Sequence, residues 1–323
     1  MGNEIDISVN LCGIELNNPT MLASGVLGGT AGSLRRVAQN GAGALITKSI
    51  GVAPRNGYQG PTVIEPMENV LLNAMGLPNP GYKEFINELN DARDIDIPII
   101  PSIFGSNGKE YVEVAKAMEK AGSKLLEVNI SCPHPYSKCR DLLIGQDLDE
   151  TQNVIKEIKK AVQIPIIVKL SPNVTDIAKF AEKAIESGAD AISAINTIQA
   201  IEIHPEFERP ILGNLVGGQS GASIRPIALR KVADIVLKID SLKKEGQLEK
   251  EIPVIGVGGV SDGLDIVRFL LIGATCVQIG TAVKDNLAVF DKSVRQLKEY
   301  MVKKNYESLN DFRGNALQWL HPH

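Results

Sequence analysis

Eight short runs of apolar, β-branched residues recur along the chain, and each is followed by an amphipathic stretch of helical length. The runs span residues 20–24, 43–48, 97–102, 124–130, 164–170, 190–196, 252–258 and 275–281. Continuous apolar strands that alternate with helices are typical of a parallel sheet covered on both faces. Eight such units predict an α/β fold of the closed (β/α)8 type, a TIM barrel.

A weaker pair of apolar segments, residues 5–8 and 13–16 around the turn Asn-Leu-Cys-Gly, precedes the first run. It predicts a short N-terminal β-hairpin at the bottom of the barrel. No linker or low-complexity segment interrupts the pattern, so residues 1–323 are expected to form a single domain. The charged stretch at 239–251 is interpreted as an insertion, either a solvated helix end or a partner contact.

The composition is that of an ordinary globular chain. Of its residues 44% are apolar and 22% charged, the formal net charge is -4 and the pI is near 5.7. It lacks the basic excess that binding to nucleic acid requires. The first ten residues are no secretory signal, and the longest apolar stretch, broken by Gly273 and Gly280, is too short to span a bilayer. A cytoplasmic protein is expected.

Four cysteines, Cys12, Cys132, Cys139 and Cys276, are widely spaced, without a C-x-x-C pair for zinc or an iron–sulfur cluster, so no metal site is expected. Free cysteine is usually a small buried hydrophobe. Cys132 differs because it follows the fourth predicted strand, in the loop layer where barrels carry catalysis. A thiolate there would be a nucleophile or a general base. Without a visible partner set for a cysteine hydrolase, proton abstraction is preferred.

Polar residues and glycines follow the other strands, and in such barrels the carboxyl ends of the strands form the active site. They are Ser24, Lys48, Ser49, Asn129, Asn196, Thr197, Gly258, Gly259, Gly280 and Thr281. The glycine turns after strands seven and eight offer backbone N–H groups where barrels bind phosphate, although tight packing alone would also explain them. We expect a phosphorylated ligand.

Lys48 and Lys169 each close an apolar strand, where an ammonium group is costly unless it has a negative partner. Either lysine alone is typical of a strand edge, from which a long stem reaches water. Two lysines on the same rim as the glycine turns indicate a site for an anionic ligand. Asn73, Asn129 and Asn196 have the donors and acceptors to read a planar ring with amide edges, but asparagine is also common in turns.

Several motifs resemble those of the class 1 dihydroorotate dehydrogenases. They are NPTMLASG, ITKSIG, NAMGLPNPG, EVNISCPH, VKLSPNVTDI, AINT, GGQSGASIRPIALRKV and GVGGVSDGLDIVRFLLIGATCVQIGTA, in this order between about residues 5 and 313. The resemblance implies a (β/α)8 barrel that binds one FMN. It also implies oxidation of (S)-dihydroorotate to orotate, a step of de novo pyrimidine (UMP) biosynthesis.

The resemblance assigns roles residue by residue. It implies FMN contacts at Ser24, Lys48, Ser49, Ser102, Asn129, Lys169, Ile195, Gly221, Gly258, Gly259, Gly280 and Thr281. It implies substrate contacts at Lys48, Asn73, Ala74, Met75, Gly76, Leu77, Asn129, His134, Asn196 and Thr197. Cys132 stands at the catalytic base, which takes the C5 proton while hydride leaves C6 for the flavin. The loop that begins at Pro133 would form a lid.

Two positions depart from the family pattern. Ser102 replaces an asparagine that contacts FMN, and His134 replaces a substrate asparagine. The Cys-Pro-His form is also similar to dihydropyrimidine dehydrogenases, which act on uracil and thymine. An enzyme of that kind is the alternative to a dihydroorotate dehydrogenase. NAMGLPNPG and Lys48, a partner for a carboxylate that uracil lacks, favour dihydroorotate. A noncatalytic phosphate-binding barrel is a separate hypothesis, since a fold alone does not establish an activity.

The resemblance also bears on the electron acceptor. A cysteine base, and a sequence without a membrane-associating extension, argue against the quinone-linked class. VKLSPNVTDI and residues 217–226 are more similar to the NAD-linked subclass, whose barrel pairs with an FAD and iron–sulfur subunit. Such a partner and a homodimeric core are therefore expected.

Overall fold

The structure is a computed structural model, and it describes residues 5–131 and 144–320. At its centre lies a parallel sheet with the strand order β7-β4-β3-β17-β16-β11-β10-β9-β8. Its members are β3 (Thr20–Leu22), β4 (Ala44–Ile46), β7 (Ile99–Ile100), β8 (Ser102–Ile103), β9 (Leu126–Asn129), β10 (Ile166–Lys169), β11 (Ala191–Ala194), β16 (Val254–Val257) and β17 (Cys276–Ile279).

The sheet closes on itself through one chain segment. β7 and β8 are separated only by Pro101; β7 pairs with β4 and β8 pairs with β9. A proline has no N–H to donate to a strand ladder, so the segment is divided at this point. Each of the eight predicted runs contains a barrel strand, and the predicted (β/α)8 barrel is confirmed.

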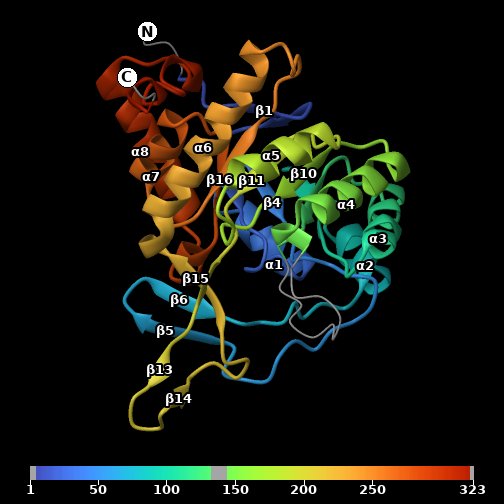
Figure 1. The fold of residues 1–323 in the computed structure, drawn as a ribbon. Helices are drawn as coiled ribbons and strands as arrows, with labels where there is room; N and C mark the ends of the chain where they lie inside the picture. Colours follow the sequence, from blue (N-terminus) through green and yellow to red (C-terminus); the bar gives the residue numbers. More distant parts are fainter. Residues whose placement is uncertain (1–4, 132–143, 321–323) are drawn as a thin grey trace.

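Helices cover the outside of the barrel (Figure 1). They are α1 (Ala31–Ala38), α2 (Tyr82–Asp91), α3 (Gly108–Lys120), α4 (Leu148–Ala161), α5 (Ile177–Glu186), α6 (Arg225–Lys244), α7 (Gly263–Leu271) and α8 (Val289–Lys304). Side-chain caps start several of them: Asn107, Asp147, Asp176 and Asp262 each accept a hydrogen bond from the first turn of α3, α4, α5 and α7. Within the described residues, no helix is long and apolar enough to cross a membrane.

The N-terminal hairpin is present, but its first strand begins later than predicted. β1 (Val9–Leu11) pairs antiparallel with β2 (Ile14–Leu16) around a turn at Cys12 and Gly13, both of which have positive φ. The predicted strand at 5–8 is wrong because Asp6 accepts hydrogen bonds from the backbone N–H and hydroxyl of Ser8, which turn the chain instead.

An accessory antiparallel sheet was not predicted. It has the order β12-β15-β6-β5 and projects from the barrel at the end opposite to β1 (Figure 1). Its strands are β5 (Val63–Met67), β6 (Val70–Asn73), β12 (Ile198–Ala200) and β15 (Gly217–Gly221), and a small pair, β13 (Ile203–His204) with β14 (Arg209–Pro210), lies beside them. The sequence of β15, Gly-Gly-Gln-Ser-Gly, has no apolar alternation from which a strand could be predicted.

The stretch 239–251 begins as the last turns of α6 and then forms a loop. The helix end that was expected there is present, but it is not wholly solvated, since Ile239 and Leu242 are buried. Lys243 forms an ion pair with Glu251 at 2.6 Å. This pair ties the loop to the helix ahead of β16.

Candidate active site

Hydroxyl groups meet at the carboxyl ends of the first three barrel strands. The Ser49 hydroxyl shares hydrogen bonds with the hydroxyls of Ser24, at 3.2 Å, and Ser102, at 2.9 Å. Ser49 and Ser102 are buried. Ser102, the first of the two departures from the family pattern, therefore points into the same cluster as its predicted neighbours.

Asn129 connects these serines to the other side of the rim. Its amide Nδ2 donates to Ser49 Oγ at 3.1 Å, and its Oδ1 accepts from Ser131 Oγ at 2.9 Å. Asn196 Nδ2 donates to Ser131 Oγ and, at 3.4 Å, to Asn129 Oδ1. Asn129 is thus held in one orientation, and among the described residues one N–H of its amide has no partner.

Lys48 lies half-buried two residues after the end of β4. Among the described residues its ammonium group has no ion-pair or hydrogen-bond partner, and burial lowers its pKa. A cation that loses water without gaining a negative partner is unfavourable in the free protein. The position is therefore suited to an anionic ligand.

Lys169 is buried inside the barrel and does have partners. Its Nζ donates to Gln278 Oε1 at 3.0 Å and contacts Glu127 Oε1 at 3.5 Å. Glu127 Oε2 in turn accepts from Gln278 Nε2 at 2.6 Å and from Ser193 Oγ at 3.2 Å. These four side chains form a polar cluster below the rim, which we call the Glu127 cluster.

The glycine turn after β16 meets the start of α6. Gly259 has φ 72°, and a Cβ there would lie 2.7 Å from Arg225 Cβ and 2.9 Å from the carbonyl oxygen of Gly221. A Cβ at Gly258, with φ 134°, would lie 3.6 Å from Ile195. Glycine is needed here, and the close approach assembles four of the predicted FMN residues.

The turn after β17 adds the remaining members. Thr281, which begins the 3-10 helix Thr281–Lys284, donates its hydroxyl to Ser220 Oγ at 2.9 Å. A Cβ added at Gly280 would lie 3.3 Å from Ala23 Cβ, directly before Ser24. Both turns therefore lie against β15, and the turn after β17 also lies beside the serine cluster, where glycine lets a ligand approach the backbone closely.

Asn73 reaches this rim through the accessory sheet. Its Nδ2 donates to the carbonyl oxygen of Gly218 at 3.1 Å, and Gly218 packs directly against the Thr197 hydroxyl. The backbone N–H of Thr197 donates to Asn196 Oδ1 at 2.8 Å. The accessory strands thus bring Asn73 to the two predicted substrate residues that follow β11.

The segment after Asn73 forms a loop on the same side. Ala74 is buried, and Gly76, with φ 73°, leaves no space for a Cβ because Tyr58 lies against it. The Leu77 carbonyl oxygen accepts a hydrogen bond from Asn79 Nδ2, and that of Met75 accepts one from the Tyr58 N–H. Their contacts here are with the surrounding loop, so a substrate role for Ala74 through Leu77 stays a prediction.

Three predicted elements lie outside the described residues: Cys132, His134 and most of the lid loop. Ser131, directly before Cys132, is buried and bonded to Asn129, so the chain enters that loop from the rim. Two other cysteines are described. Burial raises the pKa of the Cys12 thiol to about 12 and raises that of Cys276 further, so both are poor candidates for a base.

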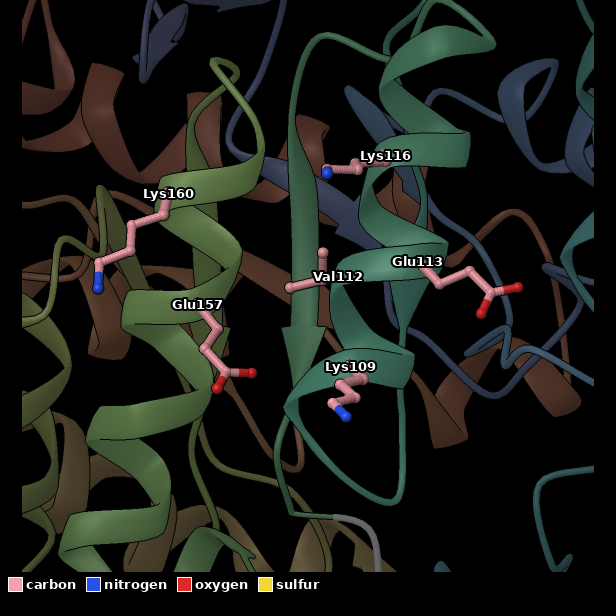
Figure 2. A pocket seen from close by; sticks show the side chains of 6 residues that line it. All are labelled: Lys109, Val112, Glu113, Lys116, Glu157 and Lys160. Atoms are coloured by element: carbon pink, nitrogen blue, oxygen red, sulfur yellow. The ribbon is translucent and has the colours of Figure 1, made fainter.

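Other hollows lie away from the rim. One lies on the outside, between α3 and α4 (Figure 2), where it is lined by Lys109, Val112, Glu113, Lys116, Glu157 and Lys160. The Glu157 carboxylate points toward α3 and packs against Gly108, at the positive end of that helix. We interpret this contact as structural.

A further hollow lies at the amino ends of the strands, beside Cys12. There Asp190 forms ion pairs with Lys159 at 2.8 Å and Lys250 at 3.4 Å. In barrels of this class that end carries stability, and the opposite end carries the chemistry.

Sequence reasoning missed Glu127, Ser193 and Gln278. Glu127 and Gln278 interrupt otherwise apolar strands, and a charged or amide side chain at the centre of a buried run was the signal that could have found them. Sequence reasoning considered the residues that follow each strand, and these three positions lie inside the strands.

The fold is that of a (β/α)8 barrel protein, with a candidate site for an anionic ligand at the carboxyl ends of its strands. The family model for dihydroorotate dehydrogenase matches residues 6–301. The chain belongs to the dihydroorotate dehydrogenase family, as the motifs predicted.

Named relatives are similar over their whole length. The dihydroorotate dehydrogenase B (NAD(+)) catalytic subunit of Pyrococcus furiosus is 44% identical over 313 residues, which cover 97% of this chain and 99% of the relative. The protein of the same name from Methanocaldococcus jannaschii is 41% identical over 318 residues, with 97% and 99% covered. That of Methanocella arvoryzae is 43% identical over 310 residues, with 96% and 97% covered.

Proposed function

We propose that this protein is a dihydroorotate dehydrogenase that oxidises (S)-dihydroorotate to orotate in de novo pyrimidine biosynthesis. The observation that carries the proposal is Lys48, a half-buried cation with no partner among the described residues, on the rim that holds Asn129 and Asn196. Dihydroorotate offers a carboxylate for the lysine and amide edges for the asparagines. Uracil has no carboxylate, and the relatives named above do not favour the dihydropyrimidine dehydrogenase-like alternative.

FMN fits the donors that converge on this rim. Its phosphate would be held at Gly258, Gly259, Gly280 and Gly221, where close backbone approach requires glycine. Its ring would be held by Lys48, Lys169, Asn129 and the serines Ser24, Ser49 and Ser102. When bound, FMN supplies a two-electron acceptor for the hydride from C6 of the substrate.

The residues of the chain bind and orient the substrate and remove a proton. Lys48 pairs with the substrate carboxylate, and the amides of Asn73, Asn129 and Asn196 bond the ring edges. The fixed orientation of Asn129 reduces the entropy cost of correct placement. Cys132, as a thiolate, takes the C5 proton, so that substrate loses one proton and one hydride in total.

The electrons must then leave the barrel. We propose that they pass to NAD+ through a separate subunit with FAD and an iron–sulfur cluster, and that the barrel forms a homodimer in the cytoplasm. Support comes from the relatives, whose names describe a catalytic subunit of an NAD+ enzyme. This chain has four cysteines without the spacing of a cluster site, which is consistent with such a division.

The test is the visible spectrum of the purified, FMN-loaded protein before and after dihydroorotate is added without oxygen. We expect the yellow absorbance of the flavin to disappear after dihydroorotate is mixed with the protein. Protein with Cys132→Ala should bind FMN equally well but bleach at least ~100-fold more slowly, the size of a lost general base. A spectrum that dihydroorotate leaves unchanged would contradict the proposal, and bleaching by dihydrouracil instead would support the alternative.

A further inference from the structure

The Glu127 cluster is an unusual filling for the inside of a barrel. Glu127, Ser193 and Gln278 come from β9, β11 and β17, which are alternate strands, and Lys169 comes from β10 between the first two. Inward layers built from alternate strands are normally packed with branched apolar residues. Here all four side chains are polar, and Glu127 and Ser193 are completely buried.

Such a cluster is a weak source of stability. A buried ion pair loses about as much through desolvation as it gains through attraction, and apolar residues of similar volume often stabilise a fold more. The cluster is nevertheless fully bonded: Glu127 accepts from Ser193, Gln278 and Lys169. A satisfied polar network in this place holds its members in one geometry.

The geometry that is fixed is that of the Lys169 ammonium group. An ammonium has three donors, of which one is directed to Gln278 Oε1 and one to Glu127 Oε1. Gln278 is itself oriented by its Nε2 bond to Glu127, so its oxygen must face the lysine. Among the described residues one N–H of Lys169 has no acceptor, and the lysine, at the carboxyl end of β10, retains 5% side-chain exposure.

We propose that Glu127 is a positioning residue that acts through Lys169, setting where this ammonium group lies and how strongly its charge would act on a bound flavin. The inference rests on the proposed function, since the cofactor concerned is the flavin. The Glu127 carboxylate compensates the charge of Lys169, and Gln278 keeps the ammonium from moving fully onto that carboxylate. The flavin therefore meets a weakened positive field, and the two groups together limit how strongly reduction is favoured.

Two variants separate charge from position. Glu127→Gln removes the compensating charge at nearly constant volume, so the reduced flavin gains stability. We expect the ratio of reduced to oxidised flavin at a fixed potential to rise about tenfold, which is ~30 mV upward for a two-electron couple. Gln278→Met leaves the formal charge unchanged but frees the ammonium to approach Glu127. We expect its midpoint potential to fall and its FMN dissociation constant to rise about fivefold, by loss of roughly one hydrogen bond.

Asp190→Asn is the matched control. It makes the same carboxylate-to-amide change in a lysine pair beside β10 and β11, but at the opposite end of the barrel. It should lower stability and leave the flavin potential unchanged, which shows that destabilisation alone does not move the potential. The measurements are a spectroscopic redox titration and an FMN fluorescence titration of each folded protein.

The outcomes distinguish this inference from the proposed function. Wild-type protein that takes up no FMN overturns both. Wild-type protein that loads FMN and is bleached by dihydroorotate, while Glu127→Gln and Gln278→Met keep its potential and FMN affinity, overturns the positioning role alone. If Glu127→Gln does not fold, Gln278→Met decides the question, because an unchanged potential and affinity in that variant excludes positioning of Lys169.

Discussion

Lys48 shows how a proposed binding residue can oppose folding. Burial lowers its pKa below the usual 10.5, so the folded protein holds the ammonium less well than the unfolded chain does. The unfolded state therefore binds more protons between the two pKa values, and stability rises with pH through that window. Below the window the cost of the buried charge is fully present.

Lys48→Met should accordingly stabilise the ligand-free protein at pH 7, by about 0.5–1 kcal/mol, the usual gain where a functional strain is removed. The gain should shrink as the pH approaches 10.5, because the wild-type lysine loses its proton. Urea unfolding at pH 7 and pH 9.5 measures both. A variant that is less stable than wild type at pH 7, or a gain independent of pH, would show that the lysine has a stabilising partner.

The described cysteines should be unreactive while the protein is folded. Burial raises the pKa of Cys12 to about 12, so almost no thiolate exists near neutrality, and Cys276 is completely buried. Iodoacetamide at pH 8, followed by peptide mass spectrometry, should leave both unlabelled. Full labelling in denaturant is the control. Modification of Cys12 at the rate of an exposed thiol would contradict its described environment.

At the level of elements, the glycine turns are the most sensitive connections. Gly259→Ala places a Cβ within 2.9 Å of the Gly221 carbonyl oxygen and forces a positive φ on alanine. The turn must then move away from β15, and we expect FMN affinity to fall at least ~10-fold, the equivalent of about 1.4 kcal/mol. Equilibrium dialysis against FMN measures the loss.

Gly122→Ala is the matched control for this change. Gly122 also has positive φ, 98°, but a Cβ there meets nothing within 4 Å. It should lower stability by about 1 kcal/mol through backbone strain and leave FMN affinity unchanged. Equal affinities for the Gly259 variant and this control would show that the turn after β16 does not contact the ligand.

The barrel strands could be predicted because nearly all their residues are buried on both faces, which gives apolar runs such as residues 166–168. The rim could be predicted in part, since Ser49, Asn129 and Asn196 each follow a strand. The Gly-rich strand β15 could not be predicted, because its sequence has no local pattern of a strand. Its pairing with Asn73, which brings Asn73 close to Thr197, could not be predicted either. Glu127 and Gln278 do stand out inside their apolar strands, but their contacts with Lys169 form only after the cylinder has closed, so the cluster itself could not be predicted.

At the scale of the whole molecule, the residues that the structure describes form two apolar cores of very different size. The barrel core is extensive, whereas the accessory sheet has a core of only four buried residues, Val70, Leu72, Ala74 and Leu212. A sheet with so little buried apolar area is not independently stable and depends on its contacts with the rim. It is therefore expected to open more easily than the barrel.

Native-state hydrogen exchange should resolve this difference. We expect amides of β6 and β15 to exchange through an opening that costs several kcal/mol less than the one that exposes β10 and β11, whose amides should report global unfolding. Exchange measured by NMR or mass spectrometry over a series of low urea concentrations gives both free energies. Equal values for the two sets would mean that sheet and barrel open as one unit.

The pairing of β3 with β17 joins the first barrel strand to the last. Because a ribosome releases the chain from its N-terminus, β3 emerges more than 250 residues before its neighbour Cys276–Ile279 exists. Throughout elongation the nascent sheet therefore carries unpaired edges, which are templates for association with other chains. A truncation that removes β17 would leave two such edges permanently unpaired, one on β16 and one on β3.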